Sequence, residues 1–410
     1  MALNIVFIAF FVIAFIIALI KCIFLGDTTI FKTLTDGIFD SAKSSVLDVA
    51  FPLTGTLVFF LGLMNIAEKA GAIRKLAIWL NPFMKRLFPG VPDGHPAMGE
   101  MVMNFSANML GLDNAATPFG LKAMESLQSI NPNKETATNA QIMFLVLHTS
   151  GLTLIPLSII TYRLAAGSLD ATSVFIPCVA GTVITTLASI IIVSFKQKLK
   201  WDFVLIAWIT SIAALITALL LFVSRLSDVQ RNTFSNVSGS LILLILIIGI
   251  LAAGVYKKVP VFDAFIDGAK DGFGVVLKII PYLVGMLVAI RVFRDCGALD
   301  YIVHSIGYLV KAAGLNTDFV PSLPTAIMKP FSGSGARGMM IDTMNAYGPD
   351  SFVGKLACTF QGSADTTLYI LALYFGSVGI KKVRYALWAG ILADIIGVVA
   401  AIFIGYIFFK

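Results

Sequence analysis

Charged residues are scarce in this chain of 410 residues: Asp, Glu, Lys and Arg make up 13% of it, against roughly 25% in an ordinary soluble domain. Hydrophobic residues make up 58% of the chain, and the mean hydropathy is +0.91. No stretch is polar enough to cover a water-facing surface, which excludes a string of soluble domains. The sequence therefore predicts an all-α polytopic membrane protein.

Cysteine and histidine are also rare. Four Cys, all in or beside apolar runs, exclude a disulfide-rich scaffold. Three scattered His residues match no zinc-binding spacing. Gly333–Gly338 matches G-x-G-x-x-G but follows no strand, and Ser150 lies only two residues from His148, on a different helix face. We therefore expect no enzyme, no cofactor and no metal site, and a membrane-embedded hydrolase is disfavoured.

A basic domain is lacking too. The 30 Lys and Arg residues outnumber the 23 Asp and Glu residues, but they are spread through short loops between apolar runs. No aromatic-interleaved basic patch is present, which argues against nucleic acid as a partner. Charges in such loops instead indicate membrane topology. The expected partners are the lipid bilayer and a small-molecule solute.

What the sequence does contain is nine stretches that are long and apolar enough to cross a bilayer. Six of them lack charged residues, two contain one acid each, and the ninth is flanked by Lys278 and Arg291, which can reach the interface. The first stretch has no basic n-region and is interpreted as an uncleaved span. The nine are 1–20, 49–67, 136–162, 171–195, 203–224, 232–256, 275–293, 356–380 and 385–409.

Shorter segments of two kinds lie between these spans. Four amphipathic segments are expected to lie at the interface: 28–48, 70–88, 260–276 and 297–314. Two apolar segments, 96–128 and 318–346, are interrupted by small and polar residues at 111–118 and 330–337. Each predicts a re-entrant broken-helix hairpin, because irregular backbone at membrane depth persists only where protein or a wet cavity satisfies it.

The two halves of the chain are internally similar. Asp40-Ser-Ala-Lys43 matches Asp267-Gly-Ala-Lys270, and Ser150-x-x-Thr153 matches Ser363-x-x-Thr366. Between these motifs the hairpins align as well. The similarity divides the chain into a first repeat (1–200), a linking span and loop (201–231) and a second repeat (232–410).

The number of membrane crossings in each repeat and the distribution of charge predict how the repeats are oriented. If the hairpins re-enter, each repeat has four crossings, and the single linking span inverts the second repeat; hairpins that crossed fully would make the repeats parallel. An N-terminus inside places the basic loops 69–86, 196–200, 257–258 and 381–384 in the cytoplasm. Two inverted repeats with interfacial helices, hairpins and about nine crossings are typical of secondary transporters, whose substrate site lies between the repeats.

The hairpin segments resemble known families. Asn108–Met124 is similar to the signature of spore maturation protein A, and Lys329–Met340 with Gln361–Thr367 is similar to that of spore maturation protein B. The chain resembles the two fused end to end. The resemblance implies the nucleoside-recognition or "gate" domain, shared with concentrative nucleoside transporters and the membrane domain of ferrous-iron transporter B. It implies a nucleoside-like or other small metabolite as solute, and a multi-pass protein of a bacterial inner (plasma) membrane.

Polar residues inside the predicted membrane region are candidates for function, because burying them there costs free energy. The half-helix that follows each hairpin break offers free N–H groups to an anion or carbonyl oxygen. By repeat symmetry the two hairpin tips should meet near the midplane and share one cavity, lined by Asp113, Asn114, Ser150, Ser334, Ser363 and Asp365. The full set of candidate solute- or ion-binding residues is Asn108, Asp113, Asn114, Thr117, His148, Ser150 and Thr153 with Ser332, Ser334, Arg337, Gln361, Ser363, Asp365 and Thr366.

Structural interpretations of several of these residues stay open. Asp113 is also placed as a helix N-cap, and His148 as a core histidine with satisfied hydrogen bonds. Arg337 is placed to neutralise Asp342 or Asp365. The Ser and Thr residues are able to join neighbouring helices, and the sequence offers no partner for Asp394.

The favoured function is a transporter that binds a small polar solute between inverted repeats. Coupling to Na⁺ or H⁺ through Asp113 or Asp365 would drive alternating access. The alternative is a membrane protein of the same fold that does not transport and serves as a scaffold or regulator. Association into a homo-oligomer is left open by the sequence.

Overall fold

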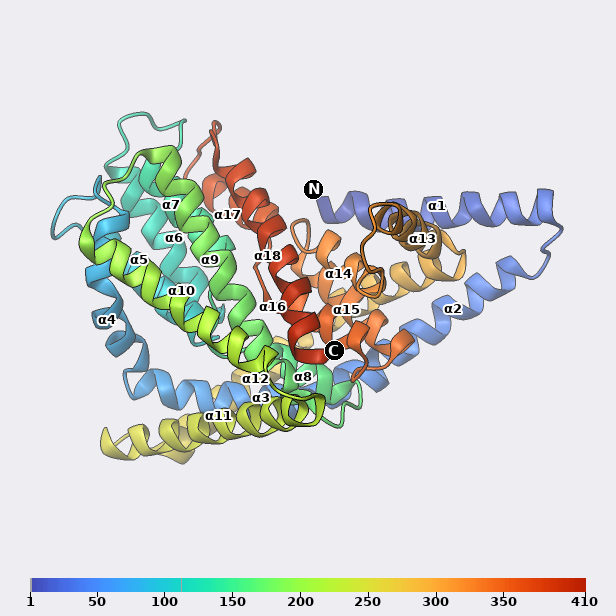
Figure 1. Cartoon of the computed structure of the whole chain (residues 1–410), viewed down its shortest axis with the longest axis horizontal. Coiled ribbons are helices and arrows are strands. Elements are labelled where there is room, and N and C mark those ends of the chain that lie inside the picture. The colour runs from blue at the N-terminus through green and yellow to red at the C-terminus, as the bar shows by residue number, and fades with distance from the viewer. Residues whose placement is uncertain (1, 112) are drawn as a thin grey trace.

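The computed structural model describes residues 2–111 and 113–410, and leaves out the side chains of 2–6, 113–115 and nine positions between 228 and 282. In the described part the chain forms eighteen α-helices and no strand longer than one bridge (Figure 1). The first repeat contains α1 (Ala2–Leu25), α2 (Ile30–Ser44), α3 (Phe51–Lys69), α4 (Ala72–Leu87), α5 (Pro96–Met109), α6 (Asp113–Ser129), α7 (Asn139–Thr149), α8 (Leu157–Ala165) and α9 (Phe175–Gln197).

The remaining helices repeat this order after one linking helix. The amphipathic segments and both hairpins lie close to their predicted positions, as α2, α4 and α13 and as the pairs α5–α6 and α14–α15. The helices are α10 (Phe203–Ser224), α11 (Asp228–Tyr256), α12 (Val261–Asp295), α13 (Ala298–Ala312), α14 (Leu323–Met328), α15 (Gly333–Tyr347), α16 (Phe352–Gly362), α17 (Thr367–Ser377) and α18 (Ala386–Phe409).

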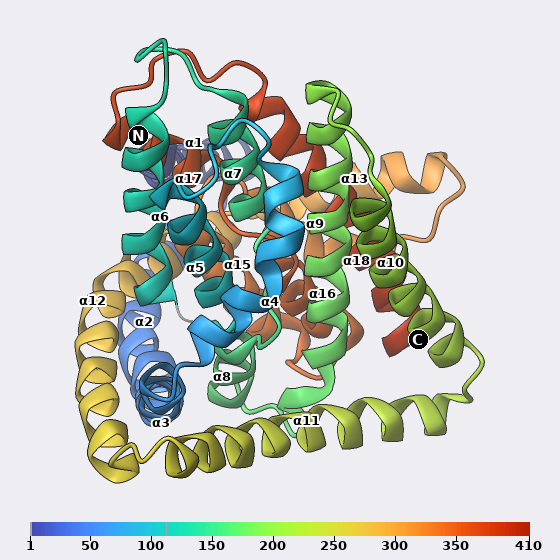
Figure 2. The ribbon, with the colours of Figure 1, turned by 90° about the vertical axis from the view of Figure 1, so that its left-hand side faces the viewer.

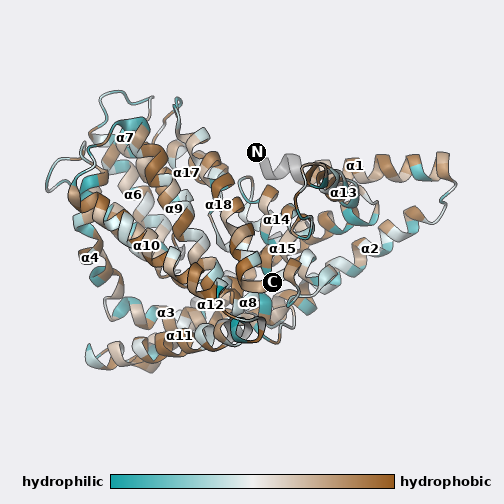
Figure 3. Cartoon of the chain, in the orientation of Figure 1, coloured by the Kyte–Doolittle hydropathy of each residue, from teal (hydrophilic) through white to brown (hydrophobic). Residues whose placement is uncertain are grey.

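The outer helices carry the surface that a bilayer would cover. Within the described residues, six helical segments are long and apolar enough to cross a membrane. The most apolar windows of α1 and α10 are only 11% buried inside the protein, and Figure 3 shows hydrophobic residues along α1, α10 and α11. Since such surfaces are unstable in water, the chain is an all-α polytopic membrane protein, as predicted; nine crossings stay a prediction.

Two of the nine expected spans are not continuous helices. In place of the expected span 136–162, α7 ends at Thr149 and α8 begins at Leu157. In place of 356–380, α16 ends at Gly362 and α17 begins at Thr367. Counting uncharged residues overlooked the helix breakers inside these runs, Gly151 and Pro156 in the first of them.

The boundary between an interfacial helix and the next span also differs from expectation. Residues 260–276 and 275–293 form one continuous helix, α12. In the first repeat, a π-helical segment (Ser45–Ala50) joins α2 to α3 without a loop. Both repeats therefore contain a long helical rod that continues from the amphipathic segment into the span.

These two rods, α2–α3 and α12, pack against each other in opposite directions. At one end of the pair, Lys69 forms an ion pair with Asp267 at 2.9 Å, and Asn65 donates to the Ala264 carbonyl at 2.6 Å. At the other end, Gly37 lies beside Asp295. Corresponding helices of the two repeats thus run antiparallel, which is the packing expected for inverted repeats.

Close approach of α3 and α12 depends on glycine. A Cβ at Gly268 would lie 2.6 Å from the Leu61 carbonyl oxygen, whereas a Cβ at Gly274 on the same helix would meet nothing within 4 Å. We expect Gly268→Val to lower the free energy of unfolding by about 1–3 kcal/mol, since overpacking forces the backbones apart. Gly274→Val is the matched control, and unfolding in mixed micelles is the measurement. Equal stability of the two variants would contradict the packing described here.

The last helix of each repeat shows the same antiparallel arrangement. In the α9–α18 pair, the Lys196 ammonium lies 5.9 Å from the ring centre of Trp388. Farther along, Thr185 contacts Gly397, and Ala180 packs with Phe408. Contact along the full length of both helices makes this pair the centre of the bundle that holds the site.

Two of the basic loops, 69–86 and 196–200, lie close to each other. Arg86 at the end of α4 pairs with Asp202 at 3.1 Å, which brings the loop before α10 beside α4. In Figure 1 the ends of α3 and α11 lie at the lower left, and the α17–α18 loop lies at the upper edge, left of the N-terminus. Figure 2 shows α11 running across the lower edge, at a large angle to α9 and α10. The assignment of these loops to the cytoplasmic side stays a prediction.

Membrane topology is testable by labelling single cysteines in a variant lacking the four native ones. We expect Lys198→Cys and Lys382→Cys to react with a membrane-impermeant maleimide only from the cytoplasmic side, and Gln230→Cys only from outside. The reason is that α10 carries the chain across the membrane once between positions 198 and 230. Labelling of positions 198 and 230 from the same side would overturn the inverted arrangement.

Candidate functional site

The two interrupted helices, α7–α8 and α16–α17, cross where each is broken. The Asp365 backbone N–H donates to the Thr149 carbonyl at 2.8 Å. Gly151 packs against this point, with φ at +64°, and a Cβ there would lie 2.8 Å from the Asp365 nitrogen. Both the left-handed backbone and the close contact require glycine. The crossing therefore depends on Gly151.

Each hairpin tip is bonded to the interrupted helix of its own repeat. The Leu154 N–H donates to the Met109 carbonyl at 2.8 Å, and the Leu368 N–H donates to the Pro330 carbonyl at 2.9 Å. These bonds occupy equivalent places in the two repeats, and they satisfy backbone groups that the helix breaks leave free. Four helix interruptions, two from each repeat, thus meet in one place.

A cavity of about 140 Å³ lies at this meeting point. Its walls come from the ends of α5, α8, α14 and α16, from α15, and from the segments that interrupt α7–α8 and α16–α17. It is lined by Asn108, Gly111, Gly151, Thr153, Ile155, Pro156, Leu157, Ser158, Ile159, Lys329, Arg337, Gln361, Gly362, Ala364 and Asp365.

Five of the residues singled out from the sequence line this cavity: Asn108, Thr153, Arg337, Gln361 and Asp365. The sequence analysis named all five as candidate binding residues, but of the six residues that it placed in one shared cavity only Asp365 is among these lining residues. Their function in binding stays a prediction. The structure adds Lys329 and Ser158, which the sequence analysis did not select.

Several other candidates lie next to the cavity and hold the backbone. Ser150 donates to the Leu147 carbonyl at 2.6 Å and contacts the Thr186 hydroxyl at 2.9 Å. Ser363 donates to the Phe360 carbonyl at 3.0 Å. These serines, expected in the shared cavity, therefore terminate helices and are not among its lining residues.

In the second hairpin, Ser332 is the N-cap of α15. Its Oγ accepts from the Gly335 N–H at 3.0 Å and lies 3.2 Å from Ser334 Oγ. Thr366 is buried and precedes α17, while Thr117 is exposed on α6. The structure does not place these four in the cavity wall, and the expected cavity position of Ser334 is a correction. The side chains of Asp113 and Asn114 lie outside the described residues.

His148 is held by two asparagines. Its Nδ1 lies 2.9 Å from Asn104 Oδ1 and 3.1 Å from Asn108 Nδ2. Asn104 in turn donates to the Ala116 carbonyl at 2.7 Å, which joins the two arms of the first hairpin. A single Nδ1 either donates to Asn104 or accepts from Asn108, so each tautomer makes one of these two hydrogen bonds. Through them the buried ring is linked to Asn108, which lines the cavity. The sequence analysis missed Asn104.

The buried charges near the cavity pair differently from expectation. Asp342, one of two acids expected beside Arg337, instead forms an ion pair with Arg294. The Arg337 guanidinium lies 5.4 Å from the ring centre of Tyr162. Asp394, for which the sequence offered no partner, accepts from the Thr367 hydroxyl at 2.7 Å. Asp365 accepts from the Thr366 N–H at 2.7 Å while lining the cavity.

A second cavity of about 320 Å³ is lined by Tyr162. Ser44, Asp48 and Asn345 give this cavity a polar lining, together with Tyr162 itself. The Arg337 guanidinium, which lies over the Tyr162 ring, lines the central cavity, so that these two side chains connect the walls of the two cavities. Tyr162 is 3% exposed.

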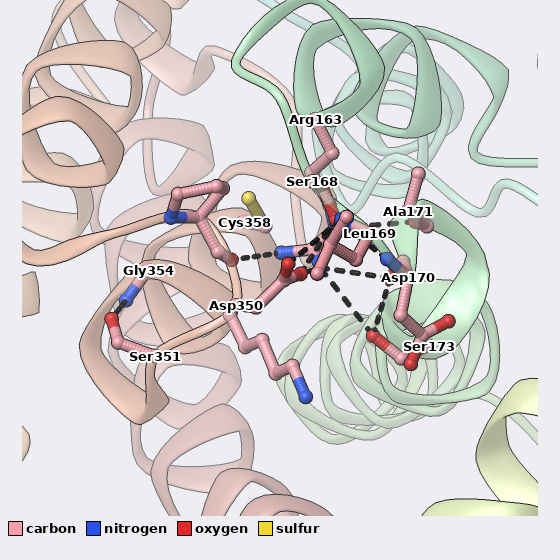
Figure 4. Close-up of polar contacts among 12 residues, drawn as sticks. Arg163, Ser168, Leu169, Asp170, Ala171, Ser173, Asp350, Ser351, Gly354 and Cys358 are labelled. Carbon is pink, nitrogen blue, oxygen red and sulfur yellow. Dashed lines mark hydrogen bonds and ion pairs between the residues drawn. The ribbon is translucent and has the colours of Figure 1, made fainter.

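Arg163 joins the two repeats at one end of the core (Figure 4). Its fully buried guanidinium donates to Asp350 Oδ1 at 2.7 Å and to the Pro349 carbonyl at 2.5 Å, both before α16. It also donates to the Asp170 and Ala171 carbonyls before α9, at 2.9 and 3.2 Å. We call this group the Arg163 tie.

The Asp350 carboxyl of the Arg163 tie has a shifted pKa. Burial alone raises the pKa of the Asp350 carboxyl, but donors from Ser168 Oγ and the Leu169 N–H and the charge of Arg163 outweigh it. The pKa of Asp350 therefore lies below its ordinary value, and the carboxyl is charged at neutral pH.

The opposite end of the core carries an equivalent connection between the equivalent loops. Thr136 and Lys382 form a parallel β-bridge, and the Ala137 N–H donates to the Lys382 carbonyl at 3.0 Å. Lys381 forms an ion pair with Glu135 at 2.6 Å. We call this group the Lys382 tie. With the Arg163 tie it fixes both ends of the helices that form the cavity.

The described residues were compared with what a metal site needs. Among the residues that the structure describes, no three His, Cys, Asp or Glu side chains come together as a metal site requires.

Comparison with known proteins was made at the level of families, curated proteins and solved structures. A family model described as "Gate: Nucleoside recognition" matches residues 50–169 and 276–381, one segment in each repeat. All of the cavity-lining residues fall inside these two segments. No solved structure matches the chain.

Two curated proteins of Bacillus subtilis (strain 168) are similar to this chain. Spore maturation protein B is 53% identical over 160 residues, which are 39% of this chain and 88% of that protein. Spore maturation protein A is 40% identical over 161 residues, which are 39% of this chain and 82% of that protein.

Proposed function

Because the chain belongs to the Gate family of nucleoside recognition, we propose that it binds a small polar solute in the central cavity and moves it across a bacterial inner membrane. The observation that carries this proposal is the meeting of four helix interruptions around a polar cavity. Irregular backbone persists at membrane depth only where protein or a wet cavity satisfies it, and paired broken helices are a common feature of the substrate sites of secondary transporters.

Support for movement comes from the second cavity, which Tyr162 lines. It offers the solute a second polar space, and the Tyr162 ring in its wall lies beside Arg337 of the central cavity. Movement of Tyr162 and Arg337 together would join the two spaces. Asp365, the one acid among the described lining residues, is the group we assign to coupling with Na⁺ or H⁺.

A second candidate function, a non-transporting scaffold or regulator, is favoured by the two ties. The Arg163 tie and the Lys382 tie connect the repeats at both ends of the core, and they restrain motion of one repeat's interrupted helix against the other's. Both curated relatives are named for spore maturation, a cellular role.

The test uses the full chain, purified and reconstituted into vesicles. Radiolabelled nucleosides, dipeptides and dicarboxylates are offered with and without a Na⁺ gradient and with and without a pH gradient. Saturable binding with gradient-dependent uptake is the expected result. Binding without uptake would favour the scaffold or regulator, and absence of saturable binding across the panel would contradict solute recognition by this cavity.

A further inference from the structure

The interfacial helices α4 and α13 occupy equivalent places in the two repeats but differ in their packing. Each begins directly after a glycine with a left-handed backbone, Gly71 with φ at +81° and Gly297 with φ at +88°. Five residues of α4 are buried, whereas only two residues of α13 are. Phe83 and Leu309, which follow these glycines at the same distance, are 9% and 67% exposed. The second repeat therefore leaves uncovered a helix face that the first repeat buries.

The first hairpin and the linking helix cover α4. Phe83 packs in one cluster with Met101 of α5, and its ring centre lies 5.2 Å from that of Trp208 on α10. A chain with one linking helix can cover only one of its two interfacial helices in this way. In the second repeat, α13 approaches the hairpin mainly at the short segment Val320–Ser322 before α14.

An apolar cavity of about 220 Å³ lies between α13 and the second hairpin, and we call it the α13 groove. Its α13 wall consists of Leu299, Ile302, Val303 and Ile306, which have the spacing of a single helix face. Phe10 of α1 and residues of α14 complete it, and every lining side chain among the described residues is apolar. Figure 1 shows α1, α13 and α14 together, on the side of the molecule away from α4.

The α13 groove is continuous with the surface that the bilayer would cover. Ile302 and Ile327, from α13 and α14, are both exposed at its mouth. The helix α1, whose Phe10 lines the groove, has an apolar window that is only 11% buried. A water molecule in the groove would lack the polar partners that ordered water needs. Acyl chains, which surround α1 in a membrane, match the apolar walls.

From this difference between the repeats we propose that the α13 groove binds an acyl chain of a bilayer phospholipid, in the place that protein side chains take beside α4. The chain lies against Met328 and Phe331, which flank the break of the second hairpin. Between these two residues, Lys329 lines the central cavity and Pro330 accepts the hydrogen bond from Leu368. A bound lipid therefore supports the hairpin tip, and this inference does not depend on solute binding.

The test fills the α13 groove with protein. Ile306→Trp places an indole ring in the groove, and Tyr308→Trp is the matched control, because Tyr308 is exposed on the opposite face of α13. The full chain is purified, stripped of lipid in detergent and offered dipalmitoyl phosphatidylglycerol, and native mass spectrometry counts the bound lipid. We expect Ile306→Trp to retain phospholipid at least about tenfold more weakly than the wild type, the effect of losing contacts to about two methylene groups. Tyr308→Trp should match the wild type.

Thermal unfolding of the same samples checks folding and provides a second measurement. Added phosphatidylglycerol should raise the unfolding temperature of the wild type and of Tyr308→Trp, since a ligand stabilises the state that binds it. The unfolding temperature of Ile306→Trp should not respond, because its indole already occupies the groove. Ile327→Lys, at the exposed mouth, puts a charge in the path of the chain and should weaken retention without filling the groove.

Three results would overturn the proposal. The first is equal phospholipid retention by the wild type, Ile306→Trp and Ile327→Lys. The second is a change of oligomeric state in Ile306→Trp, measured by light scattering, with lipid retention unaltered, because the groove would then contact a second copy of the chain. The third is saturable binding of palmitate without binding of phosphatidylglycerol, which would assign the groove to free fatty acids.

Discussion

Asp365→Asn is expected to abolish the dependence of solute binding on Na⁺ or H⁺ and to weaken binding by about 10- to 100-fold. The reason is that Asp365 is the one carboxylate among the described residues that line the central cavity. The asparagine oxygen still accepts from the Thr366 N–H, now 2.7 Å from the carboxylate. Folded protein should therefore persist in the membrane, and Asp365→Glu should retain part of the coupling.

The control for this experiment is Asp394→Asn. Asp394 is buried, bonds to the Thr367 hydroxyl and is not among the lining residues, so that its replacement should leave the ion dependence in place. If Asp365 instead neutralises Arg337, Asp365→Asn should destabilise the fold by about 3–5 kcal/mol. Recovery of both stability and binding in the double variant with Arg337→Gln would then remove Asp365 from the coupling mechanism.

Arg163→Met is expected to cause the largest loss of stability, about 3–5 kcal/mol. The guanidinium is fully buried and bonds to carbonyl groups of two loops and to Asp350. Methionine fills similar space but leaves these acceptors without donors. Arg163→Lys should be intermediate, because an ammonium cannot reach as many acceptors as a guanidinium. Chemical unfolding in mixed micelles, at a fixed protein concentration, is the measurement.

A matched control exists in the pair of Arg86 with Asp202. It also joins distant segments, but its side chains are 36% and 45% exposed, and Arg86→Met should cost no more than about 1 kcal/mol. Similar losses for the two arginines would contradict the role given to burial.

Since the pKa of Asp350 is lowered in the fold, the contribution of its carboxylate to the free energy of unfolding is present at neutral pH. This contribution to stability should be lost as the pH falls from the ordinary carboxyl range toward the lowered pKa of Asp350.

The sequence predicted the elements of the fold better than their continuity. Amphipathic spacing located α4 and α13, and the clusters of small residues located both hairpin tips. Hydropathy failed at 136–162 and 356–380, because a mostly apolar run does not reveal a break at Gly151 or after Gly362. Those breaks are satisfied by hydrogen bonds from the other segments of the core, such as Asp365 to Thr149, which a linear pattern does not show.

For the candidate site, symmetry between repeats was informative about position and less so about side-chain direction. It placed Thr153, Gln361 and Asp365 in one region, where they line the cavity. It could not distinguish them from Ser150 and Ser363, whose hydroxyls bond to carbonyls of the preceding turn. Next to a helix break, a shift of one residue decides whether a side chain points into the cavity or packs against a neighbouring helix. The local backbone conformation determines this direction, and the sequence pattern does not reveal it.

The linking helix α10 has a consequence for how the molecule is assembled. Its most apolar window is only 11% buried, so it adds little to the core, yet it keeps the two repeats on one polypeptide. The two similar proteins of Bacillus subtilis are separate chains, each matching 39% of this one. A covalent link holds the surfaces of α3 and α9 at millimolar effective concentration near α12 and α18. It also fixes the stoichiometry of the two repeats at one to one, so that each apolar packing surface is synthesised together with the surface that covers it.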